Sequence, residues 1–123
     1  MNLQLSLREK WFRMTKSGVK KEDYRDITPY WSAILLTYWG EKKTKEFWKM
    51  KIDFHGSEFQ LNRVVESKKF DCNIMTLGYP KSTDTERILK LEHKGIEIGF
   101  GKPEWGAEPN KLYFIIKHGE IIK

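Results

Sequence analysis

The sequence lacks long apolar runs and internal repeats, and it contains a single cysteine. Its most apolar run, around residues 34–36, is far below the roughly 20 residues that a membrane-spanning helix needs. The lone cysteine, Cys72, excludes an internal disulfide framework and any zinc site built from several cysteines. The N-terminus shows no basic segment followed by an apolar one, so we expect no secretion signal. We therefore expect a cytoplasmic protein with no metal, no cofactor and no membrane partner.

The composition favours one compact domain over the full length of 123 residues. Hydrophobic residues make up 39 % of the chain, which is enough to fill one modest core. Charged residues make up 33 %, which provides a well-solvated surface, so we do not expect a disordered chain.

The positive charge is concentrated in the first part of the chain. Residues 1–51 hold 12 Lys and Arg against 6 Asp and Glu, whereas residues 52–123 hold 11 of each. All of the net charge of +6 therefore lies in the first two-fifths of the sequence. A segregated basic surface favours a polyanionic partner, because lysines and arginines that neutralise phosphates release condensed counterions. A charge that serves only solubility remains an equal alternative.

Helical patterns occupy the first half of the sequence after an initial strand. Residues 3–7 alternate apolar with polar, as a half-buried strand does. Ser6 and Glu9 have the spacing of a capping box, which predicts a helix that Gly18 ends. Pro29 predicts the start of a second helix, apolar on nearly every side through residue 39. We place Trp31 and Trp39 in its core-facing part and expect a third, charged helix over residues 41–51.

Strand patterns dominate the second half. We predict strands over residues 70–77, 86–98 and 112–117, the last continuing toward residue 122. Cys72, within the first of these, is expected to be a small buried hydrophobe. Helices followed by successive strands indicate an α+β fold with a strongly bent sheet or a small barrel.

Residues 18–25 read Gly-Val-Lys-Lys-Glu-Asp-Tyr-Arg and resemble the G-x-K-x-x-E-x-R signature of ASCH domains, relatives of the PUA fold. Gly18, Lys20 and Arg25 match the signature, and Asp23 stands where the family usually has Glu. The stretch around Trp105 and residues 113–117 resemble the closing strands of small bacterial and phage members. The similarity covers about residues 3–38 and 70–122. Residues 39–69 fit poorly, and we interpret them as an insertion within a single domain spanning residues 1–123.

The resemblance implies a PUA-like small β-barrel with flanking helices around a cleft that holds the signature. It also implies binding of RNA, a nucleotide or a modified nucleoside. One branch with a similar fold hydrolyses N4-acetylcytidine, with a lysine at the position of Lys20 activating a threonine at the position of Asp23. Because Asp23 has no hydroxyl group, the sequence counts against a simple transfer of that mechanism.

The predicted binding site therefore consists of the signature residues and two candidate stacking aromatics. We expect Lys20 to supply positive charge in an open cleft and Arg25 to bind a phosphate or base edge, while Asp23 orients them or accepts from an amino group of the ligand. Residues 19–25 have the pattern of an extended strand, on which Lys20 would share a face with Glu22, and Asp23 would share the other face with Arg25. A purely structural ion pair between Asp23 and Arg25 is an equal alternative to ligand binding. The complete list of predicted binding residues is Gly18, Lys20, Asp23, Arg25, Tyr79 and Trp105.

Each aromatic candidate has a structural alternative. Trp105 and Tyr79 can stack an unpaired base, which is worth about 1–3 kcal/mol, but Trp105 can equally plug one end of a barrel. The histidines His55, His93 and His118 have no metal-binding spacing.

Two other functions remain open. In a small hydrolase acting on RNA or a modified nucleoside, Lys20 would be the activated base and Glu104 would assist. Thr28 lies close to Lys20 in the sequence, but this proximity does not place it in the cleft. In a protein-interaction domain, residues 39–69 would present Phe47 and Trp48 to a partner, and a homo-oligomer remains an open alternative.

Overall fold

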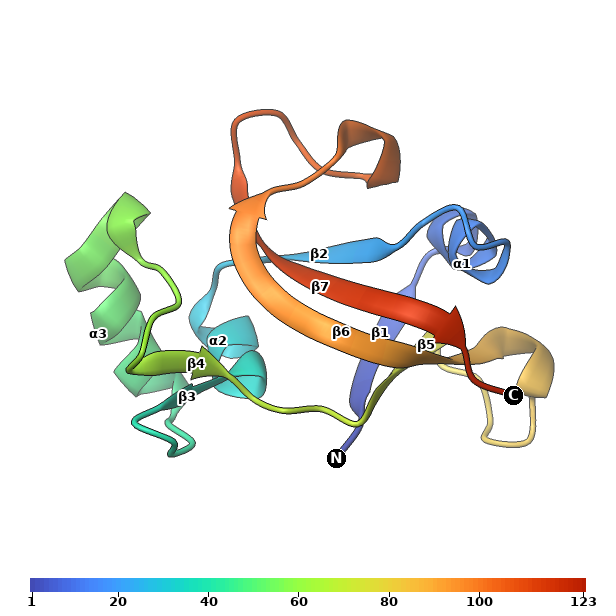
Figure 1. Cartoon of the computed structure of the whole chain (residues 1–123), viewed down its shortest axis with the longest axis horizontal. Helices are drawn as coiled ribbons and strands as arrows, with labels where there is room; N and C mark the ends of the chain where they lie inside the picture. Colours follow the sequence, from blue (N-terminus) through green and yellow to red (C-terminus); the bar gives the residue numbers. More distant parts are fainter. The chain divides into compact units, whose positions relative to one another are not determined.

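The computed structural model describes all 123 residues and shows an α+β protein with a curled five-stranded sheet. Figure 1 shows the course of the chain. The strand order of the large sheet is β1-β5-β6-β7-β2, and β3 and β4 form a separate antiparallel pair. The strands are β1 (Leu3–Leu7), β2 (Glu22–Asp26), β3 (Leu36–Tyr38), β4 (Val65–Ser67), β5 (Cys72–Leu77), β6 (Ile88–Phe100) and β7 (Leu112–Ile121). The helices are α1 (Glu9–Lys16), α2 (Pro29–Leu35) and α3 (Lys45–His55), with 3₁₀ turns η1 (Gly56–Glu58), η2 (Thr85–Arg87) and η3 (Pro103–Trp105).

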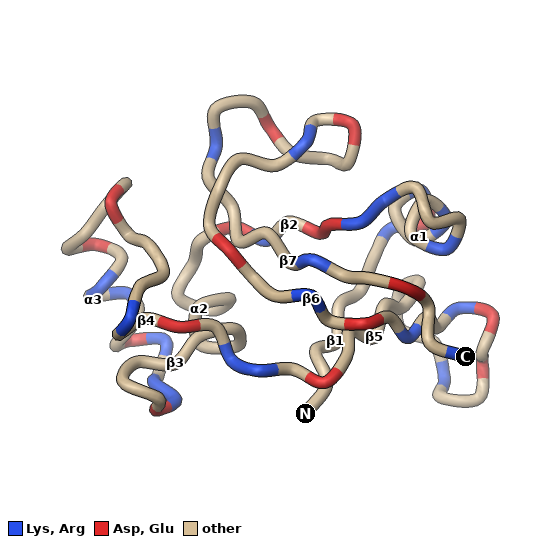
Figure 2. Tube along the Cα trace, in the orientation of Figure 1, with Lys and Arg blue, Asp and Glu red and all other residues tan.

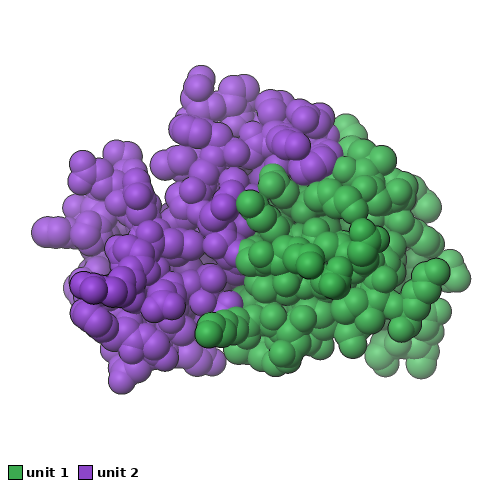
Figure 3. Space-filling model, in the orientation of Figure 1, with its two compact units in different colours: residues 1–23, 69–95, 116–123 green, residues 24–68, 96–115 purple.

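The chain forms two compact units, and neither is a continuous stretch of sequence (Figure 3). The first unit contains residues 1–23, 69–95 and 116–123. The second unit contains residues 24–68 and 96–115. No helix in either unit combines the length and the apolar character that crossing a bilayer would require.

The first unit is built on β1, which pairs in parallel with β5. Leu3, Leu5 and Leu7 are buried while the residues between them are exposed, so the strand predicted over residues 3–7 is confirmed with its alternation. Met75 lies opposite Leu5 in the register and is fully buried. Burying a side chain of this size stabilises the fold by about 1.5–3 kcal/mol.

The start of α1 differs from the prediction, whereas its end agrees. Ser6 stays within β1 and donates its hydroxyl to the carbonyl of Gly78, so it does not cap the helix. Arg8 occupies the N-cap position without a side-chain hydrogen bond, and the side chain of Glu9 bonds Arg13 instead. Pairing with β5 extends to Leu7, which leaves Ser6 no freedom to turn toward the helix. Gly18 has a φ of 85°, as predicted for the glycine that ends this helix.

The second helix begins as predicted but ends four residues earlier. Pro29 is the first residue of α2, and the hydroxyl of Thr28 caps it by accepting from the amide of Trp31. Residues 36–38 leave the helix because they pair with β4. Trp39 follows in a turn with a φ of 50° and is 65 % exposed, so the prediction that it belongs to the core is wrong.

The remaining elements lie close to their predicted positions. The third helix is shifted toward the C-terminus, from residues 41–51 to α3, because Thr44 accepts from the amide of Phe47 and sets its start. The three predicted strands appear as β5, β6 and β7. Cys72 is buried in β5, as expected.

Candidate functional site

The signature segment begins where α1 ends, within the first unit. The left-handed backbone of Gly18 turns the chain away from the helix, and the amides of Val19 and Lys20 donate to the carbonyl of Met14. β2 starts only at Glu22, so Lys20 precedes the strand. The strand alternation used to place its side chain therefore does not apply to it.

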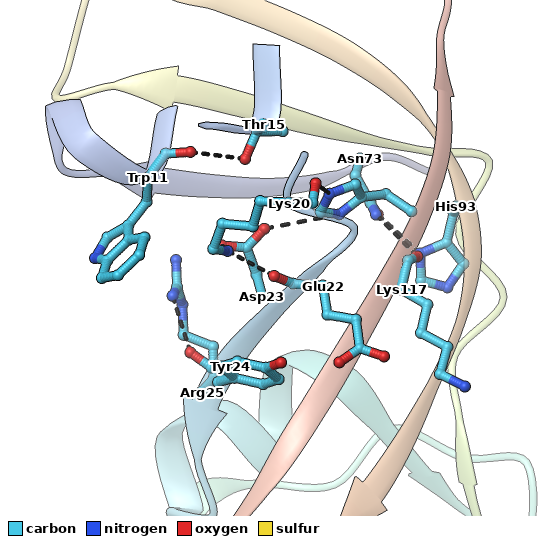
Figure 4. Close-up of polar contacts among 11 residues, drawn as sticks. Trp11, Thr15, Lys20, Glu22, Asp23, Tyr24, Arg25, Asn73, His93 and Lys117 are labelled. Carbon is cyan, nitrogen blue, oxygen red and sulfur yellow. Dashed lines mark hydrogen bonds and ion pairs between the residues drawn. The ribbon is translucent and has the colours of Figure 1, made fainter. Parts of the chain in front are cut away.

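Lys20, Asp23 and His118 form a buried group, which we call the Lys20 cluster (Figure 4 shows Lys20 and Asp23). Lys20 and Asp23 are each 2 % exposed and His118 is 4 % exposed. The ammonium of Lys20 donates to Oδ1 of Asp23 at 2.5 Å and to the carbonyl of Glu22 at 2.6 Å. The prediction that Lys20 faces away from Asp23 as a cation in an open cleft is therefore wrong. In this structure Asp23 already compensates its charge.

His118 joins the cluster from β7 through its ring and its backbone. Nε2 donates to the carbonyl of Lys20 at 2.9 Å, and the backbone amide donates to the carbonyl of Lys21 at 3.1 Å. A carbonyl oxygen can only accept, so the proton of the neutral ring lies on Nε2 and Nδ1 is left as an acceptor. These two bonds fasten the signature segment to β7.

One edge of the cluster lacks hydrogen bonds. Nδ1 of His118 lies 3.7 Å from Oδ2 of Asp23, and neither atom has a hydrogen-bond partner. Burial lowers the pKa of His118, and the carbonyl of Lys20 and the carboxylate of Asp23 oppose that shift. The charges of Lys20 and Lys21 lower the pKa further. The neutral ring is thus favoured, although a second proton would turn Nδ1 into a donor for Asp23.

We expect the free energy of unfolding to fall as the pH drops below about 6.5, because the unfolded chain then takes up the proton that buried His118 resists. The contribution of neutral His118 to the free energy of unfolding is complete above the ordinary histidine pKa. It is lost as the pH falls through the lower pKa that His118 has in the folded state. Urea unfolding at pH 7 and pH 5 measures the difference. His118→Gln can keep the donor toward the Lys20 carbonyl but does not titrate, so its loss of stability between these pH values should be smaller.

His93 serves as the comparison for this prediction, because burial also lowers its pKa. Its Nδ1 bonds Oδ1 of Asn73 at 2.8 Å, and Nδ2 of Asn73 in turn donates to the carbonyl of Lys117 at 3.4 Å (Figure 4). Some pH dependence should therefore persist in His118→Gln and disappear only when His93 is also replaced by Asn. An identical pH dependence in the wild type and His118→Gln would show that His118 does not titrate in this range.

A surface hollow of about 290 Å³ adjoins the cluster, and we call it the lysine hollow. Residues 15–18, 20–21, 119–121 and 123 line it. Its exposed cations are Lys16, Lys21 and Lys123, and its one acidic residue is Glu120. Figure 2 shows adjacent basic residues in the segment between α1 and β2, where the sequence has Lys20 and Lys21. The hollow therefore has an excess of positive charge, although the ammonium of Lys20 itself is paired below it.

Arg25 and Trp105 belong to the second unit, together with Glu104. The guanidinium carbon of Arg25 lies 5.1 Å from the ring centroid of Trp31, and Nη1 donates to the carbonyl of Tyr24. An ion pair between Asp23 and Arg25 was one of the two alternatives from the sequence, and the structure pairs Asp23 with Lys20 instead. Glu104 is exposed on η3.

Trp105 ends η3 and is half-buried, and one face of its ring is in contact with a lysine. The ammonium of Lys102 lies 4.4 Å from the ring centroid, while the amide of Lys102 donates to the hydroxyl of Tyr24. A base could thus stack only on the face of Trp105 that Lys102 leaves uncovered. Tyr79 follows β5 in the first unit and is 95 % exposed, so its ring is accessible for stacking.

Of the predicted site residues, the structure brings Gly18, Lys20 and Asp23 together in one place. Sequence reasoning missed His118, because it considered histidines only as metal ligands. The signal was its position in β7, where it shares the strand face of the buried Phe114 and Ile116. No group of three or more potential metal ligands occurs in the structure.

Two of the residues considered for hydrolysis, Lys20 and Thr28, are engaged in other hydrogen bonds. The ammonium of Lys20 holds its protons in hydrogen bonds to Asp23 and Glu22, so it is not placed to accept one. Thr28 is an N-cap whose hydroxyl accepts from Trp31. Comparison of the chain with family models, curated proteins and solved structures finds no match.

Proposed function

We propose that the first unit binds RNA or a nucleotide through phosphate contacts in the lysine hollow. The observation that carries this proposal is the excess of lysines around one concave surface, with a single acidic residue among them. Clustered lysines attract phosphates at long range and release counterions on binding. The concentration of the net charge of the chain in residues 1–51 supports the same partner.

The Lys20 cluster has a supporting role in this proposal. The segment that carries Lys21 is held by the bond between Lys20 and Asp23 and by the two bonds from His118. A segment that is already fixed loses little conformational freedom when a ligand binds, so less of the binding free energy is spent on ordering it. Lys20 therefore positions the exposed lysines, and its own ammonium does not contact the phosphate.

The resemblance to ASCH domains points to the same ligand class and is part of the proposal. The α+β fold with a curled sheet agrees with a small barrel-like architecture. Asp23, which replaces the usual glutamate, is the partner of the signature lysine. We favour binding over hydrolysis because a catalytic Lys20 would first have to separate from Asp23.

Fluorescence anisotropy with a labelled single-stranded RNA of about 12 nucleotides tests the proposal. Replacing Lys21 and Lys123 by Gln should weaken binding about tenfold at low salt, because two phosphate contacts are lost. The slope of log K against log salt should fall in magnitude by about 1.4, since each contact to a single strand contributes about 0.7.

A matched control separates this site from unspecific attraction. Lys81 and Lys90 are exposed in the same unit but do not line the lysine hollow. Their double replacement by Gln removes the same charge and should change the affinity much less. Equal losses in both double variants would contradict a specific site, as would the absence of binding by the wild type.

A further inference from the structure

A second hollow, of about 330 Å³, lies in the second unit, and we call it the aromatic hollow. It is formed by the C-terminal half of α3, by η1 and by the chain that leads into β4, with Tyr38 of β3 in its wall. Figure 1 shows α3 beside the β3–β4 pair. The hollow lies within residues 38–65, the part of the chain that we interpret as an insertion. Its size is at the lower end of the range of small-molecule sites, which is about 300–1,000 Å³.

The wall of the aromatic hollow is backed by closely packed aromatic rings. Phe59 is 4 % exposed and stacks on Trp48, with ring centroids 6.1 Å apart and an interplanar angle of 18°. Trp48 is fully buried and also contacts the rings of Tyr38 and Phe47. A ring that enters the hollow therefore meets an aromatic surface that is already in place.

Phe54 provides a second aromatic group, which is almost completely in water. Its side chain is 84 % exposed although it lines the hollow. Its ring contacts that of His55 with centroids 5.0 Å apart. A flat ligand between Phe54 and the wall would bury this phenylalanine, and each Å² of apolar surface removed from water contributes about 25 cal/mol. Pairs of aromatic rings also attract one another beyond this burial.

Lys51 supplies a positioned positive charge at the aromatic hollow. Its ammonium lies 3.3 Å from the hydroxyl of Tyr38 and 4.7 Å from the centroid of the Tyr38 ring. These contacts hold a long side chain in place without neutralising its charge. Glu58 also lines the hollow and is exposed. Asn62 uses its Oδ1 to accept from the amides of Val64 and Val65, so its NH₂ group is the part that can donate to a ligand.

We propose that the aromatic hollow binds a small planar ligand, an aromatic ring that carries a negative group. The ring packs between Phe54 and the wall formed by Tyr38 and Phe59, and the negative group accepts from Lys51. A mononucleotide and an aromatic carboxylate share this chemistry. The site is independent of the lysine hollow, which lies in the other unit.

Calorimetric titration with adenosine 5′-monophosphate and with 4-hydroxybenzoate tests the proposal and distinguishes the two sources by their relative affinity. At least one of them should bind with a Kd below about 1 mM. Adenosine lacks the negative group, and ribose 5-phosphate lacks the aromatic ring. If the ligand is a nucleotide, each of these compounds should bind at least about tenfold more weakly than adenosine 5′-monophosphate. Failure of both ringed anions to bind would overturn the proposal.

Substitutions on α3 locate the binding. Phe54→Ser and Lys51→Gln should each weaken binding about tenfold, and Phe54→Ser should melt like the wild type because its ring is exposed. Met50→Ser and Lys49→Gln lie on the same helix outside the lining and should have no effect. Glu58→Gln should strengthen binding because it removes a like charge. Equal effects of the lining variants and their controls, or weaker binding by Glu58→Gln, would refute the site.

Discussion

Replacing Lys20 by Met should reduce the free energy of unfolding by about 3–5 kcal/mol, although the two side chains are similar in length. The substitution leaves the carboxylate of Asp23 buried without its cation, since its Oδ1 loses the ammonium and its Oδ2 has no partner. The carbonyl of Glu22 also loses its donor from Lys20. Urea unfolding followed by circular dichroism at pH 7 measures the loss.

Two further variants distinguish a buried ion pair from a general sensitivity of this segment. Lys21 is exposed beside Lys20, and Lys21→Met should change the stability by less than about 0.5 kcal/mol. Lys20→Met combined with Asp23→Leu leaves no uncompensated charge from this pair and should regain much of the lost stability. If Lys20→Met is as stable as the wild type, the pairing in the Lys20 cluster is incorrect. That result would return Lys20 to the role of an accessible cation.

The substitution Trp48→Ala should cost about 3–5 kcal/mol, because it removes the largest fully buried side chain of the protein and leaves a cavity. Trp48 contacts Tyr38, Phe47 and Phe59, so the loss affects the β3–β4 region as well as α3. The wall of the aromatic hollow should lose its order at the same time. Thermal unfolding, together with the near-ultraviolet circular dichroism of the aromatic residues, reports both effects.

Trp39→Ala provides the matched comparison. Trp39 has the same side chain but is 65 % exposed, so its removal should leave the stability within about 0.5 kcal/mol of the wild type. The positive φ of Trp39 costs a little conformational free energy. Alanine at this position would have the same cost, so the comparison is not affected. A larger loss from Trp39→Ala than from Trp48→Ala would contradict the placement of the two tryptophans. It would restore the sequence-based prediction that Trp39 lies in the core.

The sequence predicted elements well where local pattern and tertiary packing agree. Three of these elements depend only on the preferences of a few neighbouring residues. They are the alternation of residues 3–7, the proline that starts α2 and the glycine that follows α1. The end of α2 was missed because residues 36–38 are held by β4, which lies about thirty residues further along the chain. Pairing over such a separation leaves no mark in the local apolar pattern, which reads as a continuous helix.

The sequence pointed to the signature segment as a candidate site, but it did not predict how the side chains of this segment are arranged. The signature segment does adjoin a lysine-rich hollow. Lys20 was nevertheless expected to be accessible, because a lysine is rarely buried unless it is paired, and its partner could not be identified from spacing. Placing Lys20 and Asp23 on one continuous strand gave the wrong faces, since β2 begins only at Glu22. The position of His118 among buried residues of β7 could have been read from the sequence.

The bond from His118 to the carbonyl of Lys20 joins residues 98 positions apart, and this separation constrains how the protein can be made. During synthesis, residues 18–25 leave the ribosome long before His118 does. The Lys20 cluster can therefore close only after His118 has emerged, and until then Lys20 and Asp23 lack their anchor on β7. A nascent chain stalled before residue 118 should accordingly expose its signature segment to chaperones and proteases.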